Sequence, residues 1–558
     1  MTYTKEQSIT KIEELVRDFR DNEVRTMRIN TPPQTLTESQ RESTLWLYLF
    51  LIFLSIILIK SAWISDDSFI TFRTIDNFIN GYGLRWNIAE RVHTNTHPFW
   101  MFLVSLFYFF TGELYYTVIL LSLFLALLSV FLVSRWLSGN ENSLFIVFSI
   151  FISSRAFVDY STSGLETPLS YLLFVIFSLY FFKRQSTSKN LVLLYIISSL
   201  AMFNRMDAIL LYFPPLIYAT YKAWETENIP ILNLLKKLLV GFAPILLWIL
   251  FSLIYYGFPF PNTYYAKLKT GISGWTLFHQ GILYVIDSLS RDTITLVVIA
   301  FSILLTFKIK EGKKTYAAVG ILLYSLYVIK IGGDFMSSRF FALPLFAAAV
   351  LLSQVQLKRN ISIILSVLFL LIGLSVQHPT SFYDKKDSAS PKSNTGIVDE
   401  RGYYFPTTGL ITGSRYQSLP NYPSIIQAKE ARKGEQKLYI KSAIGFFGHY
   451  AGPHIHIVDN MGIGDPLLAH LPADETKKWR IGHFERSIPK GYLETLETGK
   501  NCIEDPNTSK LYDIIMEITR GKIFSLKRFI LIIKFNLGYY SNLTKDRLGV
   551  SPLFEKAT

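Results

Sequence analysis

Residues 64–100 read ISDDSFITFRTIDNFINGYGLRWNIAERVHTNTHPFW, and they follow directly on an apolar run over Leu45–Ile64. That run is long enough to cross a bilayer as a helix, so Asp66 and Asp67 stand where the helix leaves the membrane. Two adjacent carboxylates beside lipid are costly unless they have partners or a task. Capping of a following helix by Ser65 and Asp66 accounts for one acid only. We therefore expect a functional site in this stretch.

The rest of the chain repeats the pattern of apolar runs. It has 558 residues, of which 50% are hydrophobic and 15% aromatic, which predicts a polytopic α-helical membrane protein. About eleven spans are expected. They are Leu45–Ile64, Tyr115–Trp136, Ser143–Val158, Leu165–Phe182, Asn190–Phe203, Ala208–Tyr221, Leu234–Tyr256, Thr293–Phe307, Tyr316–Ile331, Phe340–Val355 and Ile361–Val376. Pro98–Phe110 is apolar but short, which favours a re-entrant or interfacial helix.

Lysine and arginine clusters set the predicted orientation. They fall on one side of the membrane only if Pro98–Phe110 does not cross, and the positive-inside rule makes that side the cytoplasm. The clusters are Lys183–Lys189, Lys236–Lys237, Lys308–Lys314 and Lys358–Arg359. Residues 1–43 are then cytoplasmic, residues 44–376 form the membrane domain, and residues 65–100 are its first external loop. The net charge of +14 is consistent with such loops, and nucleic acid is not an expected partner.

Acidic residues gather at the predicted external helix ends. Helix caps and turns explain any one of them, whereas several converging on one face indicate a shared cavity. These acids are Asp66, Asp67, Asp159, Glu166, Asp207 and Asp334. The single cysteine, Cys502, excludes an intrachain disulfide and any metal site built on several cysteines.

Residues 377–558 have the composition of a soluble domain, which the topology places outside the membrane. Short strand-like segments separated by glycines suggest a small α/β layer. Ile523–Leu537 is apolar but carries lysine and arginine, so we expect an amphipathic helix on the membrane surface or on the bundle. Lys267, in the predicted external loop Gly257–Arg291, departs from the positive-inside pattern; it is either solvated or holds a lipid phosphate.

Four passages resemble the GT-C glycosyltransferase superfamily, and within it the AftB-like terminal β-arabinofuranosyltransferases of actinobacterial cell-wall assembly. The passages are Asp66–Trp100, SGLETPL at Ser163–Leu169, GGDFMSSRF at Gly332–Phe340, and VDNMGIGDPLLAHLP with WRIGHFERSIPKGY between Val458 and Tyr492. Two stretches depart from the family pattern: Arg205–Ala208 reads RMDA, and Arg91–Thr96 reads RVHTNT. Both lie where substrate would be selected.

The resemblance implies a cell (inner) membrane enzyme with its active site on the external, periplasmic face. It implies transfer of a sugar, arabinofuranose, from a polyprenyl-phosphate donor to a cell-envelope glycan acceptor. Asp66 or Asp67 is the candidate base, since general base catalysis of a hydroxyl needs a carboxylate. Cations must stabilise the departing phosphate, and the candidates are Lys267, Arg205 and Arg339. Predicted substrate-binding residues are Arg73, Glu90, His97, Trp100, Glu166, Asp207, Asp334, Asp459, Asp465, His483 and Arg486.

No cofactor is assigned from the sequence, no metal ligand is named, and a divalent cation stays open. We expect Val458–Pro472 and Trp479–Tyr492 to fold back over the external cavity, with Asp465 at its edge. Two alternatives remain: a GT-C transferase for another sugar, such as mannose, or another acceptor, and a transporter or flippase for a lipid-linked sugar. A transporter is expected to show repeated halves and charged midplane helices, which the sequence lacks.

Overall fold

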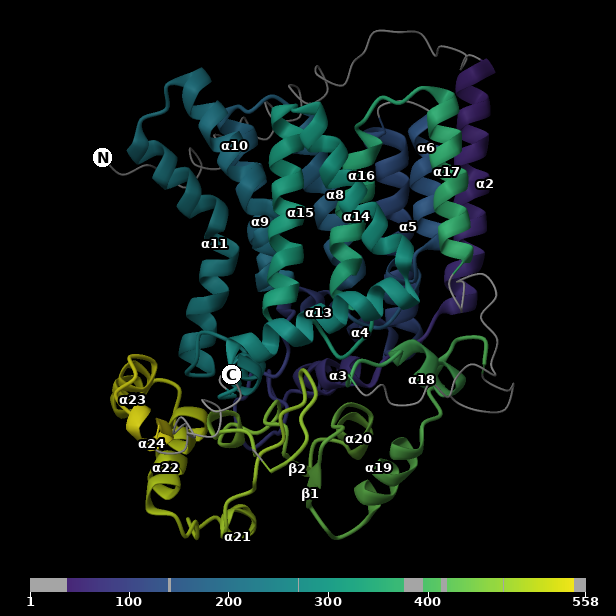
Figure 1. Ribbon diagram of the computed structural model, residues 1–558. Coiled ribbons are helices and arrows are strands. Elements are labelled where there is room, and N and C mark those ends of the chain that lie inside the picture. The colour runs from purple at the N-terminus through teal and green to yellow at the C-terminus, as the bar shows by residue number, and fades with distance from the viewer. Residues whose placement is uncertain are drawn as a thin grey trace, which may run out of the picture. The chain divides into compact units, whose positions relative to one another are not determined.

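The computed structural model describes residues 38–138, 142–268, 270–375, 395–412, 419–474 and 476–545 (Figure 1). Residues from Phe50 onward pack as one compact unit. Long helices run side by side through one part of this unit, while α3 (Asp66–Ile79), α4 (Pro98–Thr111) and α13 (Gly274–Arg291) lie across their lower ends in Figure 1.

Every predicted span falls on a helix. The helices are α2 (Glu38–Ser61), α5 (Tyr115–Leu132), α6 (Asn142–Ser153), α7 (Arg155–Tyr160), α8 (Thr167–Lys183), α9 (Ser188–Asn204), α10 (Ile209–Glu227), α11 (Ile231–Tyr255), α14 (Thr293–Ile309), α15 (Gly312–Lys330), α16 (Ala342–Ser353) and α17 (Arg359–Leu374). The predicted span Ser143–Val158 is wrong as one helix. Ser154 is extended and accepts the N–H of Phe157 at 3.2 Å, so α6 ends and α7 begins there.

Three of the described helices are long and apolar enough to cross a membrane by length and composition, or up to four if α13 and α14 count as one bent span. Several others are apolar but shorter, among them α6, α8 and α17. Large apolar side chains such as Leu247 on α11 and Leu371 on α17 are more than half exposed, as expected of surfaces that face lipid. This is a helical membrane protein, and the count of about eleven spans stays a prediction.

The predicted loop Gly257–Arg291 is largely helical, which corrects the expectation from sequence. It contains α12 (Asn262–Leu268) and α13, which is capped by Ser273 accepting the N–H of Thr276 at 3.1 Å. α13 meets α14 at 109°, and the carboxylate of Asp292 stands at the break. It accepts the hydroxyl of Thr295 at 2.6 Å and the N–H of Ala156 at 2.7 Å, which joins the break to α7.

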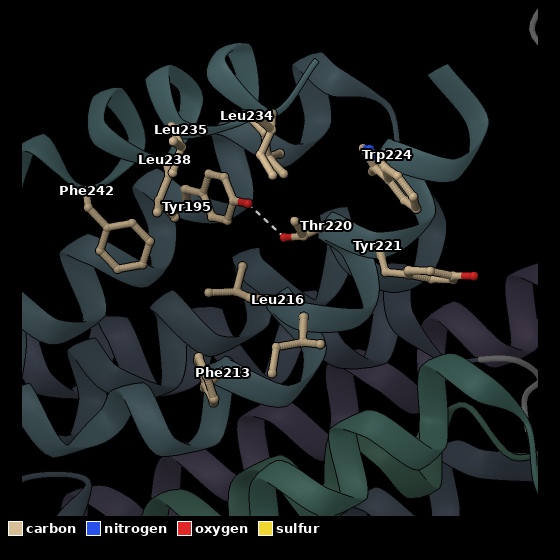
Figure 2. Close-up of a pocket in the computed structure, with 12 residues that line it drawn as sticks. Tyr195, Phe213, Leu216, Thr220, Tyr221, Trp224, Leu234, Leu235, Leu238 and Phe242 are labelled. Atoms are coloured by element: carbon tan, nitrogen blue, oxygen red, sulfur yellow. Dashed lines mark hydrogen bonds between the residues drawn. The ribbon is translucent and has the colours of Figure 1, made fainter. Parts of the chain in front are cut away.

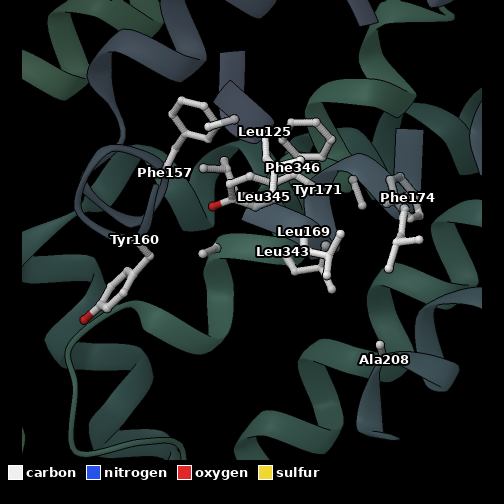
Figure 3. Close-up of a cluster of buried hydrophobic side chains, with 14 of the residues drawn as sticks. Leu125, Phe157, Tyr160, Leu169, Tyr171, Phe174, Ala208, Leu343, Leu345 and Phe346 are labelled. Atoms are coloured by element: carbon white, nitrogen blue, oxygen red, sulfur yellow. The ribbon is translucent and has the colours of Figure 1, made fainter. Parts of the chain in front are cut away.

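Aliphatic and aromatic side chains together fill the core of the bundle (Figure 3). Tyr171 of α8 stacks on Phe346 of α16 with ring centroids 4.5 Å apart, and Phe157 of α7 stacks on Tyr171 at 5.4 Å. Small residues let other helices approach closely. A Cβ at Gly320 of α15 would lie 2.3 Å from the carbonyl oxygen of Leu211, so only glycine fits where α15 packs on α10.

The C-terminal part is mostly helical around a small sheet. Strands β1 (Leu438–Lys441) and β2 (His456–Asp459) pair in parallel, with α20 (Gly445–Ala451) as their crossover. The predicted soluble α/β domain stays a prediction. α20 packs on both α19 and α3. The remaining elements are α18 (Glu400–Thr408), α19 (Pro423–Lys433), α21 (Tyr492–Thr498), α22 (Pro506–Arg520), α23 (Leu526–Asn536) and α24 (Ser541–Lys545), with short 3-10 turns at Met206–Ala208, Arg339–Phe341 and Leu468–His470 and a π turn at Val133–Leu137.

The predicted amphipathic helix near residue 530 is α23, and it docks on the bundle. The guanidinium of buried Arg528 donates to the carbonyls of Ile254 and Tyr255 at 2.7 and 2.9 Å. These are among the last carbonyls of α11, which have no partner within that helix and favour a cation. α23 is therefore fixed at the same end of the bundle as α3 and α12.

Candidate active site

A cavity of about 270 Å³ opens where α3 begins and several bundle helices end. Segments far apart in the sequence supply its walls. Of the six acids predicted to share a cavity, Asp67, Asp207 and Asp334 line it, whereas Asp66, Asp159 and Glu166 do not. Its polar lining is Asp67, Thr71, Thr94, Asn95, Thr96, His97, Arg205, Asp207, Thr263, Tyr264, Lys267, Tyr327, Asp334 and Arg339, and its apolar lining includes Leu165, Phe260, Phe340 and Ile463.

The two adjacent acids have separate environments. Asp66 is 7% exposed, and its carboxylate accepts the backbone N–H groups of Gly445 at 3.1 Å and Phe446 at 2.7 Å. A Cβ at residue 445 would lie 1.8 Å from the backbone oxygen of Asp66, so this approach requires glycine. Burial raises the pKa of Asp66 to about 6, and the neighbouring charge of Asp67 adds to the rise. Asp66 fastens α20 to the start of α3 and is not part of the cavity lining.

Asp67 is half-buried and lines the cavity. Within the described part of the chain, its carboxylate has no hydrogen-bond donor and no cation at ion-pair distance. Its charge acts on Asp334 and Arg339, which lie on the loop Gly332–Phe341 across the cavity. Asp67 is the acid of the pair that is free to meet a bound hydroxyl.

Glu166 organises the cations beneath the cavity. Its side chain is 2% exposed, and it meets Arg205 at 2.8 Å, Arg339 at 3.6 Å and Nδ1 of His97 at 3.2 Å. Arg205 also holds Asp207 through two bonds of 2.7 and 2.9 Å. Arg339 reaches Asp334 at 3.2 Å. Both predicted phosphate-binding arginines are therefore already paired with carboxylates.

Lys267 differs from these arginines. It lies on α12, lines the cavity, and has no carboxylate at ion-pair distance among the described residues. Its Nζ lies 6.0 Å from the centre of the Phe335 ring, and a Cβ at Gly482 would approach the same atom to 3.4 Å. A compact ammonium without a counter-ion is suited to an anionic ligand.

Three predicted substrate-binding residues have structural partners and lie away from the cavity lining. Arg73 stacks on Trp86 at 4.6 Å and donates to the carbonyls of Trp86, Gly448 and Ile455. Glu90 pairs with Arg520 at 3.1 Å. The indole N–H of Trp100 donates to the carbonyl of Gly164 at 3.0 Å. These side chains hold the loop and the C-terminal part on α3. Their partners are distant in sequence, so residue type alone does not distinguish them from ligand-binding groups.

The C-terminal segment does fold back onto the cavity, through Ile463. The expected position of Asp465 at the cavity edge is wrong. It is 1% exposed and accepts the N–H groups of Leu467 and Leu468 at 2.9 Å and the hydroxyl of Tyr492 at 2.8 Å. Burial raises its pKa to about 7. The Asp465–Pro466 turn therefore points the carboxylate into its own loop.

Asp459 and Arg486 are likewise internal. Asp459 accepts the N–H groups of Met461 at 2.9 Å and Gly464 at 2.7 Å, and burial raises its pKa to about 6. Arg486 donates to the carbonyls of Met461 and of Ala266, next to Lys267. Asn262 adds a bond of 2.8 Å to the carbonyl of Gly462. These bonds hold the loop around Ile463 against α12.

The structure adds lining residues that the sequence did not single out. Thr71 bonds Nε2 of His97 at 2.8 Å, one helical turn after Asp67. Tyr264, Tyr327 and Phe340 bring aromatic rings to the same cavity. The i, i+4 spacing of Asp67 and Thr71, which puts both on one helix face, was the one sequence signal that could have identified Thr71. The aromatic lining residues could not be identified, because they lie among many other aromatic residues in apolar runs.

A larger cavity of about 460 Å³ lies between α9, α10 and α11 (Figure 2). Its walls are apolar, and the hydroxyl of Tyr195 meets that of Thr220 at 2.7 Å. None of its lining residues is an acid, a histidine or a cation, so it lacks the groups that acid–base chemistry needs. No group of three or more His, Cys, Asp or Glu that could hold a metal ion occurs among the described residues.

No family model matches the chain. It is 25% identical over 526 residues to the terminal beta-(1->2)-arabinofuranosyltransferase of Mycobacterium tuberculosis, a match that covers 77% of this chain and 82% of that protein. The protein of the same name from Corynebacterium glutamicum is 27% identical over 355 residues, covering 53% of this chain and 48% of the relative. These relatives confirm the resemblance predicted from the sequence.

Two solved structures are also similar. ArnT from Cupriavidus metallidurans, crystallised with undecaprenyl phosphate, is 12% identical with a TM-score of 0.49, covering 75% of this chain and 88% of ArnT. The Archaeoglobus fulgidus oligosaccharyltransferase is 12% identical with a TM-score of 0.42, covering 74% of this chain and 62% of the enzyme.

Proposed function

We propose that this protein is a membrane glycosyltransferase that moves a sugar, arabinofuranose, from a polyprenyl-phosphate donor to a cell-envelope glycan. One observation carries the proposal: the carboxylate of Asp67 and the ammonium of Lys267 line one cavity, and neither has an ion-pair partner among the described residues, whereas the other charges of the cavity are paired. The relatives named as arabinofuranosyltransferases support the choice of sugar.

The chemistry follows from these two charges. An acceptor hydroxyl bound beside Asp67 gives its proton to the carboxylate as its oxygen forms a bond to the anomeric carbon. The bond between that carbon and the phosphate oxygen breaks, and its electron pair leaves with the polyprenyl phosphate. Lys267 stabilises the charge of this leaving group. Glu166, Arg205 and Arg339 form a charge-paired network that holds the opposite wall.

The geometry refines the catalytic assignment. Asp67 is the base in this proposal, and Asp66 positions it by tying α3 to α20. Tyr264, Tyr327 and Phe340 supply ring faces against which a sugar can stack. The site is proposed to face the external side of the inner membrane, because the lysine clusters lie at the opposite helix ends.

The test uses purified full-length protein with a synthetic polyprenyl-phosphate arabinofuranose and an arabinan oligosaccharide. Asp67→Asn should lower kcat by a factor of roughly a hundred or more, since it retains the shape but cannot accept a proton. Asp513→Asn, an exposed acid on α22, is the matched control and should transfer at the wild-type rate. Transfer at the normal rate by Asp67→Asn would refute the role of Asp67 as the base.

Polyprenyl-phosphate mannose in the same assay tests the sugar. Faster transfer from that donor would replace arabinofuranose while leaving the mechanism intact. Absence of transfer from any polyprenyl-phosphate sugar would refute the proposed function itself.

A further inference from the structure

α23 has one face that is fixed to the bundle. Arg528 and Ile532, which are one helical turn apart, are both buried. The guanidinium of Arg528 donates to the carbonyls of Ile254 and Tyr255 at 2.7 and 2.9 Å, at the end of α11. α11 is one of the helices that are long and apolar enough to cross a membrane, so α23 lies at the end of a candidate span (Figure 1).

The opposite face of α23 is exposed and apolar. Four large aliphatic side chains recur every three or four residues, which places them on one side of the helix, away from Arg528. They are Leu526, Ile530, Ile533 and Leu537, with exposed fractions of 77%, 42%, 59% and 81%. Phe524, just before the helix, is 85% exposed. We refer to these five side chains as the α23 stripe. An exposed apolar surface of this kind marks a contact with a membrane or with another protein.

Lysines border the α23 stripe. Lys527 and Lys534 each follow a stripe residue directly and are about two helical turns apart, so they lie along one edge of the stripe. Lys522 precedes the helix and is exposed. Lys527 pairs with Glu517 at 2.8 Å, while Lys522 and Lys534 have no carboxylate at ion-pair distance among the described residues. An apolar helix face edged with lysines is typical of helices that lie in the interface of a bilayer.

Lipid-facing side chains lead up to α23. Exposed apolar residues on α11 continue through Leu247 as far as Leu250, and both are more than half exposed. Leu250 is about 7.5 Å along the helix axis from Tyr255, whose carbonyl accepts from Arg528. The headgroup layer on each side of a bilayer is roughly 5–8 Å thick. α23 therefore lies at the depth of the lipid headgroups.

A second helix across the ends of the bundle also presents an exposed apolar row. α13 lies at the same end of the bundle as α23 (Figure 1). Its row is Trp275, Phe278, Ile282, Ile286 and Leu289. One bilayer surface that runs past this end of the molecule covers both rows, whereas a protein partner would have to reach two separate helices.

A second copy of the chain suits the α23 stripe less well. The commonest symmetric dimer brings the same surface of both copies together. The lysines along the stripe would then approach their counterparts and repel them. The phosphates of a bilayer carry the opposite charge and attract the same lysines. Charge therefore favours lipid as the occupant.

We propose that α23 is a bilayer-surface anchor: the α23 stripe inserts among the acyl chains next to the headgroups, and Lys522, Lys527 and Lys534 contact the phosphates of anionic phospholipids. The anchor holds the C-terminal part of the chain against the membrane at the end of α11. This role is independent of the proposed transfer reaction and of the side of the membrane on which this end lies.

The test measures the depth of single residues in a bilayer. The full chain carrying Cys502→Ser is reconstituted into bilayers of equal parts phosphatidylcholine and phosphatidylglycerol. An environment-sensitive fluorophore is attached at Leu526→Cys or Ile533→Cys, both exposed positions where a label fits without disturbing the core. Lipids with a spin label near the headgroup end of the acyl chain should quench both labels at least twofold more than a label at Glu497→Cys, an exposed position on α21.

A label at Leu247→Cys on the lipid-facing side of α11 is the positive control and should be quenched in every preparation. Quenching there without quenching at Leu526→Cys and Ile533→Cys would overturn the inference. Energy transfer between labelled copies, with the α23 labels unquenched by lipid, would overturn it in favour of a second copy as the occupant.

The lysines are tested by the triple variant Lys522→Gln, Lys527→Gln and Lys534→Gln in the Ile533→Cys background. It should lower the quenching at residue 533 by roughly twofold or more in the mixed bilayer and leave it unchanged in pure phosphatidylcholine. Equal quenching of the parent and the triple variant in both bilayers would overturn the assigned contact with anionic phosphates.

Discussion

The carboxylate of Asp66 accepts the backbone N–H of Phe446 at 2.7 Å, across 380 positions of sequence. This bond, with its companion to Gly445, joins the start of α3 to the N-terminus of α20. Asp67 is the next residue and lines the cavity. Asp66 thus holds the start of α3 in the position that presents Asp67 to the cavity. Substituting Asp66 should therefore affect stability, whereas substituting Asp67 should affect the reaction.

Asp66 should make stability depend on pH. Its folded-state pKa is raised from 3.8 to about 6, so the folded protein holds this proton more tightly than the unfolded chain. The stabilisation that comes from protonated Asp66 is fully present below about pH 4 and is lost as the pH rises to about 6. Above that pH, Asp66 makes no further change to stability. The unfolding temperature of the wild type, measured relative to Asp66→Asn, should therefore decrease as the pH is raised from about 4 to about 6. The free-energy change is on the order of 2–3 kcal/mol. A difference that rises with pH in this window would contradict the burial argument.

Lys267 should affect the affinity for the donor more than the rate of the transfer step. Lys267→Gln removes the unpaired ammonium of the cavity, and KM for the polyprenyl-phosphate sugar should rise roughly tenfold or more. Lys267→Arg should recover part of this loss because the charge is kept. Steady-state kinetics with varied donor measure the effect, and Lys510→Gln, at an exposed position of α22, provides the control. An unchanged KM in Lys267→Gln would assign the phosphate to the arginines instead.

Glu166 should matter for both stability and activity. Glu166→Gln leaves Arg205, Arg339 and His97 without the buried carboxylate that they share, a loss on the order of 3 kcal/mol. A lower unfolding temperature together with reduced transfer is expected. The exposed pair of Glu225 and Lys222 serves as the control, and Glu225→Gln should leave both measurements unchanged. Normal stability of Glu166→Gln would mean that the arginines find other partners.

The predicted topology can be tested by cysteine labelling. Cys502→Ser removes the only native thiol, and single cysteines are then introduced at the exposed residues Lys308 and Glu435. A membrane-impermeant maleimide should label residue 435 in intact cells, and residue 308 only after permeabilisation. Labelling of both from the same side would overturn the orientation and the shared external cavity.

Sequence alone determined the membrane class, helices at the predicted spans other than the broken Ser143–Val158, and the resemblance to arabinofuranosyltransferases. Apolar run length and lysine distribution are local properties that lipid and helix geometry translate directly into structure. It also identified Asp67, Lys267, Arg205, Arg339, His97, Glu166, Asp207 and Asp334, which meet at or beneath one cavity.

Only the tertiary structure decided what each charged group does. Asp66 and Asp67 are identical and adjacent in sequence, yet α20 covers Asp66 while Asp67 lines the cavity. Asp465, Arg486, Arg73 and Glu90 have the residue types of a ligand site, and long-range partners occupy them instead. The chemistry of an ionisable side chain depends on which groups the fold places next to it, and those groups are distant in sequence.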